Sequence, residues 1–359
     1  MSNPTAAGGR GERLAELVSR EGLDSLFVGD LTNIRYLTGF AGTNAACLIG
    51  PELRLFLTDF RYTERAEHEL GEGWERPGAE RELVPQLARR MSGRVGYEDA
   101  KLSVRRLAQL RDAVPDGVEL VPAGDLVEEL RAVKDAGEVA RIAAAAELAD
   151  EVYRWALEPG LAGRSEREVA RGCEARMREL GAEPSFPPIV AAGPNGALPH
   201  AEPSEREIGA GELVVFDMGA ELDGYCSDCT RTFAAGDPGA QARDVYELVL
   251  AAQQAVLAAV APGVSGPEAD SAARGPIEAA GYGERFGHGL GHGVGIEVHE
   301  APRLAASSED VLRAGNVVTV EPGVYVPGAF GVRIEDLVVV GEDGVRNLSG
   351  LPKELTPVP

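Results

Sequence analysis

One pattern of nine residues occurs twice in the C-terminal half of this chain, as GELVVFDMG at residues 211–219 and as GNVVTVEPG at residues 315–323. Each copy has a glycine, five mainly apolar residues typical of a buried strand, an acid, one further residue and a second glycine. The acids are Asp217 and Glu321. The repeat predicts two duplicated half-domains whose hairpins face each other, which is a geometry suited to a shared site.

A second acid follows each copy on a later strand: Asp228, eleven residues after Asp217, and Glu335, fourteen residues after Glu321. The first hairpin turns at ELDG, where Asp-Gly is a strong turn signal. A four-residue loop would place Asp217 directly opposite Asp228, and a two-residue loop would make them diagonal neighbours. Both registers keep the two acids on one face. The second hairpin turns at VPGAF, and a three-residue loop would place Glu321 directly opposite Glu335.

Four acids this close cannot all stay ionised without a cation, because neighbouring like charges force at least one of them to hold a proton. Two divalent metal ions about 3.5–4 Å apart would neutralise them. Histidines gather in the same half of the chain: three lie in FGHGLGHGVGIEVHE, and the four candidates are His200, His288, His292 and His299. An oxygen-rich ligand set with about one imidazole suits Mn²⁺ or Co²⁺, with Zn²⁺ as a third option.

Composition argues against several classes of partner. The net charge of −23 disfavours nucleic-acid phosphate and anionic membrane surfaces. The most apolar long run, LVLAAQQAVLAAVAPGV, is interrupted by Gln253 and Gln254 and is typical of a buried helix rather than a membrane span. The first residues, MSNPTAAGGRGERL, lack the basic start and apolar core of a signal peptide, so we expect a cytoplasmic protein.

The segment GYCSDCTRTF, residues 224–233, contains a C-x-x-C pair around Asp228. Side chains alternate along a strand, so Cys226 and Asp228 would share one face while Cys229 points to the other. The two sulfurs then cannot chelate one ion, and Asp228 is the expected ligand. We expect Cys229 to pack in the core, and the role of Cys226, close to the predicted metal cluster, stays open.

The first ~125 residues alternate helical and strand-like segments, which is an α/β pattern. The strand candidates are LDSLFVG, LRLFLTD, RVGYED and VELVPA. A helix-rich stretch follows, in which Asp135 and Glu138 predict the start of a long helix. We therefore expect one domain at residues 1–125 and a second at residues 126–359.

Several segments together resemble a known family. VVFDMGAELDGYCSDCTRTF, GHGLGHGVGIEVHE, VEPGVYV and VRIED, in this order, are similar to the Xaa-Pro dipeptidases (prolidases) and Xaa-Pro aminopeptidases, which are metallopeptidases of the pita-bread fold. NIRYLTGF and the first ~125 residues resemble their creatinase-type N-terminal domain. The resemblance implies an α+β protein with a pita-bread catalytic domain at residues 126–359, two divalent metal ions with Mn²⁺ favoured, proline-containing peptides or dipeptides as substrates, and a homodimer.

The resemblance also implies five metal ligands: Asp217, Asp228, His292, Glu321 and Glu335. Asp228 and Glu335 would bridge the two ions. Asp217 would complete the coordination of one ion, and His292 with Glu321 that of the other. In such enzymes a hydroxide held between the ions attacks the scissile carbonyl, and Glu321 would handle its proton.

Four further positions match the same family. His299 would stabilise the tetrahedral oxyanion or hold the substrate, and His200 would contact the substrate near the scissile bond. His288 and Arg333 match positions that support the metal ligands.

Other functions fit the sequence less well. A methionine aminopeptidase would not carry the N-terminal domain or the His200 segment. All five metal ligands are present here. We would expect some of them to be missing in a metal-free creatinase-type hydrolase or in a non-catalytic binding protein on the same fold. A thiol redox or zinc-ribbon protein would need a second C-x-x-C. This chain has Pro187-Pro188 where the family often has an acid or polar residue. The sequence does not separate a dipeptidase from an aminopeptidase.

Overall fold

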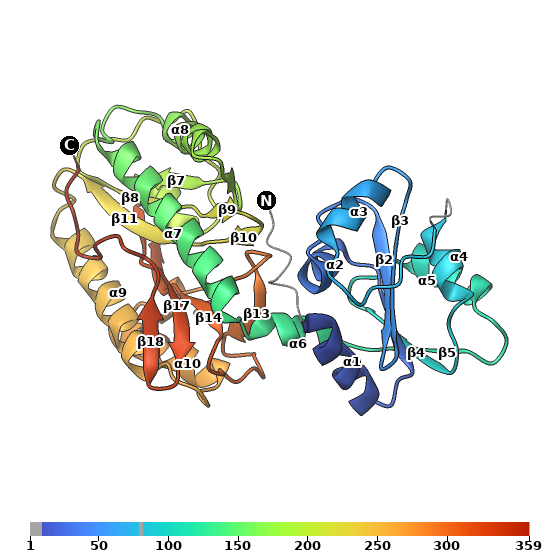
Figure 1. Ribbon diagram of the computed structural model, residues 1–359. Coiled ribbons are helices and arrows are strands. Elements are labelled where there is room, and N and C mark those ends of the chain that lie inside the picture. Colours follow the sequence, from blue (N-terminus) through green and yellow to red (C-terminus); the bar gives the residue numbers. More distant parts are fainter. Residues whose placement is uncertain (1–8, 79–81, 359) are drawn as a thin grey trace. The chain divides into compact units, whose positions relative to one another are not determined.

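The computed structural model describes residues 9–78 and 82–358. The chain forms two compact units, one ending at Arg131 and the other beginning at Ala132 (Figure 1). Residues 1–8, on which the expectation of no signal peptide largely depends, lie outside the described ranges. Among the described helices, none is both long and apolar enough to span a membrane.

The first unit has a five-stranded sheet in the order β3-β2-β1-β4-β5. On one side of β1 the pairs β1–β2 and β2–β3 are antiparallel. On the other side the pairs β1–β4 and β4–β5 are parallel. The strands are β1 (Ser25–Val28), β2 (Ala45–Gly50), β3 (Leu53–Thr58), β4 (Arg94–Tyr97) and β5 (Glu119–Pro122). The four strand candidates of the sequence are confirmed, and with them the α/β pattern of this part of the chain.

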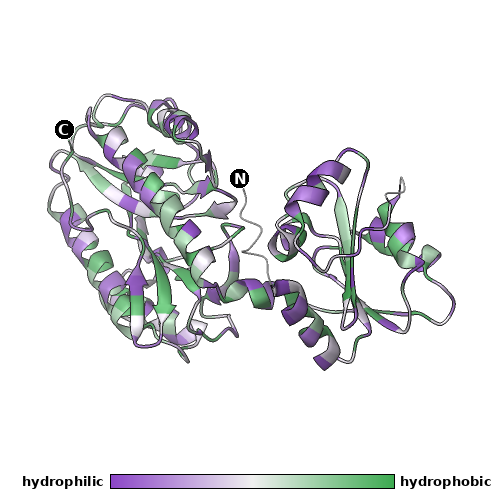
Figure 2. Ribbon diagram, viewed as in Figure 1, coloured by the Kyte–Doolittle hydropathy of each residue, from purple (hydrophilic) through white to green (hydrophobic). Residues whose placement is uncertain are grey.

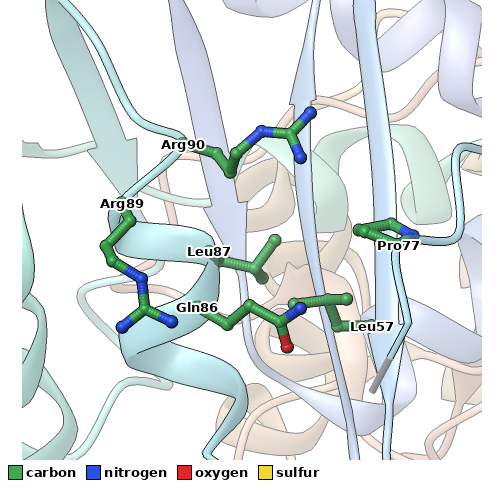
Figure 3. Close-up of a pocket in the computed structure, with 6 residues that line it drawn as sticks. All are labelled: Leu57, Pro77, Gln86, Leu87, Arg89 and Arg90. Carbon is green, nitrogen blue, oxygen red and sulfur yellow. The ribbon is translucent and has the colours of Figure 1, made fainter. Parts of the chain in front are cut away.

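Helices accompany this sheet, and buried aliphatic residues such as Leu48, Leu55 and Leu87 form its core. The helices are α1 (Arg10–Arg20), α2 (Leu31–Thr38), α3 (Thr63–Glu69), α4 (Leu83–Ala88), α5 (Val104–Ala113) and α6 (Leu126–Ala132). A pocket of about 160 Å³ lies beside α4 and is lined by Leu57, Pro77, Gln86, Leu87, Arg89 and Arg90 (Figure 3). None of the predicted site residues lines it.

The second unit consists of two halves, each with two helices over its own antiparallel strands (Figure 1). The first half has α7 (Ala136–Leu157), α8 (Glu166–Glu179), β6 (Glu183–Pro184), β7 (Ile189–Ala192), the 3-10 helix η2 (Gly193–Ala197), β8 (Glu212–Asp217), β9 (Ala220–Leu222), β10 (Tyr225–Cys226) and β11 (Thr230–Ala235). The second half has α9 (Ala240–Ala259), α10 (Gly266–Ala279), η3 (Gly283–Arg285), β12 (Gly291–Gly293), β13 (Glu300–Leu304), β14 (Val317–Val320), β15 (Gly323–Val326), β16 (Phe330–Arg333), β17 (Asp336–Gly341) and β18 (Gly344–Asn347).

The start of α7 is the one that the sequence predicts. Asp135 caps the helix and accepts a hydrogen bond from the Glu138 amide at 2.9 Å, while the Glu138 carboxylate accepts one from the Asp135 amide at 3.0 Å. This reciprocal pair satisfies two amides that the helix leaves free. The apolar run that contains Gln253 is helix α9, as expected, but only one face of this helix is buried: Gln253 is buried, whereas Gln254 is exposed.

The two halves repeat one architecture. Helices α8 and α10 each begin after a serine N-cap, Ser165 and Ser265, whose side chain accepts a backbone hydrogen bond. The first half has the sheets β11-β8-β7 and β10-β9-β6, and the second half has the sheet β13-β12-β14-β17-β18 and the pair β15-β16. The long helices carry both hydrophilic and hydrophobic residues along their length, as a helix packed on one side requires (Figure 2). The mixed helix and sheet content confirms the predicted α+β class.

Candidate metal centre

The first acidic hairpin has the shorter of the two predicted loops. A two-residue turn at Asp223 and Gly224 has positive φ at both positions, 51° and 81°, which Asp-Gly tolerates. In the resulting register Asp217 pairs with Thr230. Asp217 and Asp228 are therefore diagonal neighbours on one face, and the four-residue alternative is excluded.

The second acidic hairpin has the predicted three-residue loop, between β15 and β16. Gly323 pairs with Arg333 in that hairpin, and β14 with β17 continue the same register. Glu321 therefore lies directly opposite Glu335. The two hairpins are joined by a hydrogen bond from the Glu335 amide to the Thr230 carbonyl, at 3.0 Å.

Three carboxylates meet where the hairpins face each other. One oxygen from each of Asp217, Asp228 and Glu335 lies within 4.8 Å of the other two. These residues are 9%, 6% and 1% exposed, so water screens their charges little. Burial and then the neighbouring acids raise the pKa of Asp228 and of Glu335 well above the usual range. Burial also raises that of Asp217, although Arg333 opposes the shift.

Two oxygens of this cluster have unused acceptor capacity. Asp217 Oδ1 and Glu335 Oε1 are buried and accept no hydrogen bond from the described residues. A buried carboxylate oxygen without a donor is costly and uncommon in folded proteins. Divalent cations are bound through such oxygens, so the cluster fits a metal site.

His292 and Glu321 lie at the edge of the same cluster. His292 Nε2 is 3.6 Å from Asp228 Oδ2 and 3.3 Å from Glu321 Oε1, and its Nδ1 is 3.1 Å from the Gly293 carbonyl oxygen. When Nδ1 donates to that carbonyl, the lone pair of Nε2 is directed at the acids and can bind a metal. Burial disfavours the charged form of Glu321, but the His292 hydrogen bond and charge lower its pKa to about 2.

Arg333 holds two of the acids in place. Its NH2 donates to Asp217 Oδ2 at 2.7 Å, and its Nε donates to Thr230 Oγ1 at 3.0 Å. Thr230 in turn donates to Glu335 Oε2 at 2.8 Å. The guanidinium is 4% exposed, so these bonds form away from solvent. The arrangement leaves the opposite oxygens of both acids directed to the cluster.

His288 is linked to the same arginine through Tyr325. Arg333 NH1 donates to the Tyr325 hydroxyl at 2.8 Å, and that hydroxyl lies 2.9 Å from His288 Nε2. His288 Nδ1 is 2.8 Å from the Gly289 carbonyl oxygen. Burial lowers the pKa of His288, which favours a neutral ring that accepts from Tyr325. Neither Thr230 nor Tyr325 was predicted as a site residue. The hairpin register places Thr230 opposite Asp217, but no sequence signal singles out Tyr325.

His299 and His200 lie at the exposed side of the cluster. The His299 ring centroid is 4.4 Å from that of His292, and burial lowers the pKa of His299. His200 is exposed and follows Pro199, whose carbonyl accepts a hydrogen bond from Arg333 NH1 at 3.1 Å. Both histidines are therefore open to solvent on this side of the cluster.

The two cysteines of GYCSDCTRTF lie in different hydrophobic cores. Cys229 packs in the core beneath α7 and α8, and its Sγ is 3.6 Å from the Glu335 carbonyl oxygen. Cys226 packs with Ile142 and Val294, and its Sγ is 3.5 Å from the Ile296 carbonyl oxygen. Core packing of Cys229 is confirmed, and the sulfurs do not face one common ion.

Comparisons with known proteins identify two families in this chain. Residues 140–342 match the family described as Metallopeptidase family M24. Residues 10–133 match the family described as the Creatinase/Prolidase N-terminal domain. The two matches together span most of the chain.

Individual relatives match over nearly their whole length. An Xaa-Pro dipeptidase from Pyrococcus furiosus is 36% identical over 349 residues, which cover 96% of this chain and 98% of that relative. The structure of an Xaa-Pro dipeptidase from Bacillus anthracis has a TM-score of 0.94 and 38% identity, covering 98% of this chain and 100% of that one. The structure of an X-Pro aminopeptidase from Thermotoga maritima has a TM-score of 0.88 and 34% identity, covering 97% and 100%.

Proposed function

Since the chain belongs to metallopeptidase family M24, we propose that it hydrolyses the peptide bond that precedes proline, as an Xaa-Pro dipeptidase or Xaa-Pro aminopeptidase with two divalent metal ions. One observation carries the proposal. The buried oxygens Asp217 Oδ1 and Glu335 Oε1 accept no hydrogen bond from the described residues and lie in one cluster with Asp228. A cation would compensate all three carboxylates.

Five residues would hold the ions: Asp217, Asp228, His292, Glu321 and Glu335. Mn²⁺ suits this oxygen-rich set with one imidazole best, and Co²⁺ or Zn²⁺ are alternatives. Bound there, the ions would supply a nucleophile at neutral pH and polarise the scissile carbonyl.

The other residues of the site act on the substrate and its protons. The Glu321 carboxylate accepts the proton of the attacking water, because it lies at the edge of the cluster and its side chain is 17% exposed. His299 donates a hydrogen bond to the carbonyl oxygen as negative charge develops on it. His200 contacts the substrate near the scissile bond. Arg333 and His288 orient the acids and the Tyr325 hydroxyl.

Both candidate activities have relatives of similar likeness, named Xaa-Pro dipeptidase in Bacillus anthracis and X-Pro aminopeptidase in Thermotoga maritima. A peptide bond before proline has no N–H and an unusual shape, so a dedicated site is a reasonable solution. Assembly as a homodimer and a cytoplasmic location belong to the same proposal. Light scattering and cell fractionation test these two parts.

The direct test uses Mn²⁺-loaded protein with Ala-Pro, an Ala-Pro-Ala-type peptide, and Ala-Ala as a control. Cleavage of Ala-Pro alone identifies a dipeptidase, and cleavage of the longer peptide before proline identifies an aminopeptidase. Ala-Ala should be cleaved far more slowly than either. If neither proline peptide is cleaved by protein whose metal content has been measured independently, the proposed function is overturned.

A further inference from the structure

A carboxylate outside the metal centre is completely buried. Glu166, the first residue of α8, is 0% exposed. Its Oε1 accepts from the Ala192 amide at 2.8 Å and from Asn195 Nδ2 at 3.0 Å. Its Oε2 accepts from the Ser204 amide at 3.1 Å, from Ser204 Oγ at 2.7 Å and from Asn195 Nδ2 at 3.0 Å. These donors are neutral amides and a hydroxyl.

The donors flank one segment of the chain, residues 193–203. Ala192 is the last residue of β7 and immediately precedes the segment, whereas Ser204 immediately follows it. The carboxylate therefore ties the two ends of the segment together through one side chain. Asn195, inside the segment, adds a third point of attachment. The exposed residues between these points include His200.

The opposite side of the segment contacts Arg333 and β16, beside the candidate metal centre. The Pro199 carbonyl accepts from Arg333 NH1 at 3.1 Å. Gly196 packs against Gly331 of β16 so closely that a Cβ on Gly331 would overlap the Gly196 carbonyl oxygen. The segment is thus fixed between the Glu166 carboxylate and β16, with His200 held next to the Arg333 contact.

The second half of the unit provides an internal comparison. The Glu166 amide donates to the Arg206 carbonyl at 3.1 Å, and the Gly266 amide at the same position of α10 donates to the Asp310 carbonyl at 2.8 Å. A Cβ on Gly266 would lie 2.5 Å from the Arg303 carbonyl oxygen, so no side chain fits there. The start of α10 has the same backbone hydrogen bond as the start of α8 without a carboxylate. Glu166 is therefore not required for this type of helix start, and it occurs in the half that contains residues 193–203.

A simpler explanation for Glu166 is that its charge stabilises the N-terminus of α8. The structure argues against this explanation. An acid in the first turn stabilises a helix at low cost when it is exposed. Glu168 provides such a charge in the same turn, with its side chain 61% exposed. Burying a carboxylate costs free energy that must be offset by its hydrogen bonds, and the bonds of Glu166 are made to the segment and its ends.

We propose that Glu166 is a positioning residue that fixes residues 193–203 and thereby places His200 at the metal centre. Its effect on catalysis rests on the proposed function, because it acts through His200. Its effect on residues 193–203 does not rest on the proposed function, because the hydrogen bonds of Glu166 to Ala192, Asn195 and Ser204 are present whatever the reaction is.

The kinetic test compares Glu166→Ala in two backgrounds, the native chain and His200→Ala. In the native chain kcat/KM for the proline substrate should fall by about 10- to 100-fold, the scale expected when a substrate-contacting group shifts. In the His200→Ala background the further loss should stay below about twofold, since residues that act as one unit are not additive. Equal losses in both backgrounds would overturn the proposal. Glu168→Gln removes a charge from the same turn and is the matched control, expected to keep full activity.

Hydrogen exchange of the metal-loaded protein gives a readout that does not depend on catalysis. Glu166→Ala should speed amide exchange within residues 193–203, and Glu168→Gln should not. If Glu166→Ala fails to fold, Glu166→Gln replaces it, because its amide oxygen can still accept from Ala192 while its NH₂ faces the Ser204 amide. Unchanged exchange in a folded Glu166 variant contradicts the proposal. If the native chain cleaves no proline peptide but Glu166→Ala still speeds exchange within residues 193–203, the proposed function is refuted and the positioning role of Glu166 stands.

Discussion

Asp336→Asn is expected to destabilise the second unit severely. Asp336 follows Glu335 in the chain and is 0% exposed. Its carboxylate accepts from Arg231 NH2 at 2.8 Å, from Lys353 Nζ at 2.7 Å and from Gln253 Nε2 at 2.9 Å. Asparagine preserves the shape but removes the charge and turns an NH₂ toward one of these donors.

The magnitude follows from the burial of both charges. The Arg231 side chain is only 1% exposed, so it would be left as an uncompensated buried cation. Removing one partner of such a pair costs about 3–5 kcal/mol. Arg231 is on β11 and Asp336 on β17, so the loss also weakens the junction between the two acidic hairpins.

The assay is denaturant unfolding followed by fluorescence in a Trp74→Phe background. Trp155 on α7 then reports on the second unit alone, which matters because a chain of two units need not unfold in one step. Asp237→Asn disrupts an exposed ion pair with Arg243 and is the control, expected to leave stability unchanged. If Asp336→Asn unfolds within about 1 kcal/mol of the parent, the reasoning about the buried pair is wrong.

Three further predictions concern the sulfurs, a buried acid and the metal. Cys226→Ser combined with Cys229→Ser should still bind Mn²⁺ and stay active, because neither sulfur faces the acid cluster; loss of metal in a folded double variant would contradict this. Burial raises the pKa of Glu98 to about 7, above its value of about 4.3 in the unfolded chain. The folded first unit then holds more protons than the unfolded chain between these values, so its stability should fall as pH rises from about 4.3 to 7. Glu98→Gln should flatten that slope, as measured by Trp74 fluorescence in a Trp155→Phe background, and an unchanged slope would exclude Glu98 as the cause. Mn²⁺ at about 100 times its Kd should stabilise the second unit by about 2.7 kcal/mol over chelator-treated protein; an unchanged thermal midpoint would argue against a site in the folded state.

Local sequence rules predicted the part of the site that depends on strand pairing. The parity of each hairpin decides which side chains share a face, so Asp217, Asp228, Glu321 and Glu335 could be placed before the structure was known. The choice between two loops at ELDG depended on Asp223, which adopts a positive φ. The motifs around these acids also identified the family and the pita-bread fold, and both are confirmed by the comparisons.

Contacts between distant segments were not predictable in the same way. Tyr325 is a diagonal neighbour of Arg333 in the β15–β16 hairpin, but its hydroxyl also meets His288, 37 residues earlier in the chain, and no spacing reveals that contact. Glu166 reads as an ordinary acid at a helix start, and its partner Ser204 lies 38 residues away. Glu166 acquires its role from the packing of α8 against the strands and the segment after β7, and a single sequence carries no periodic signal for that packing.

Calorimetric titration of Mn²⁺ into metal-free protein, for the native chain and for Asp228→Asn, tests the central claim most directly. The variant should fold well, since it removes one of several like charges buried together. We predict two ions per chain for the native protein, and in the variant the loss of at least one ion together with peptidase activity. Native protein that binds no metal, or a variant that binds both ions with unchanged affinity, would contradict a metal centre built from these acids.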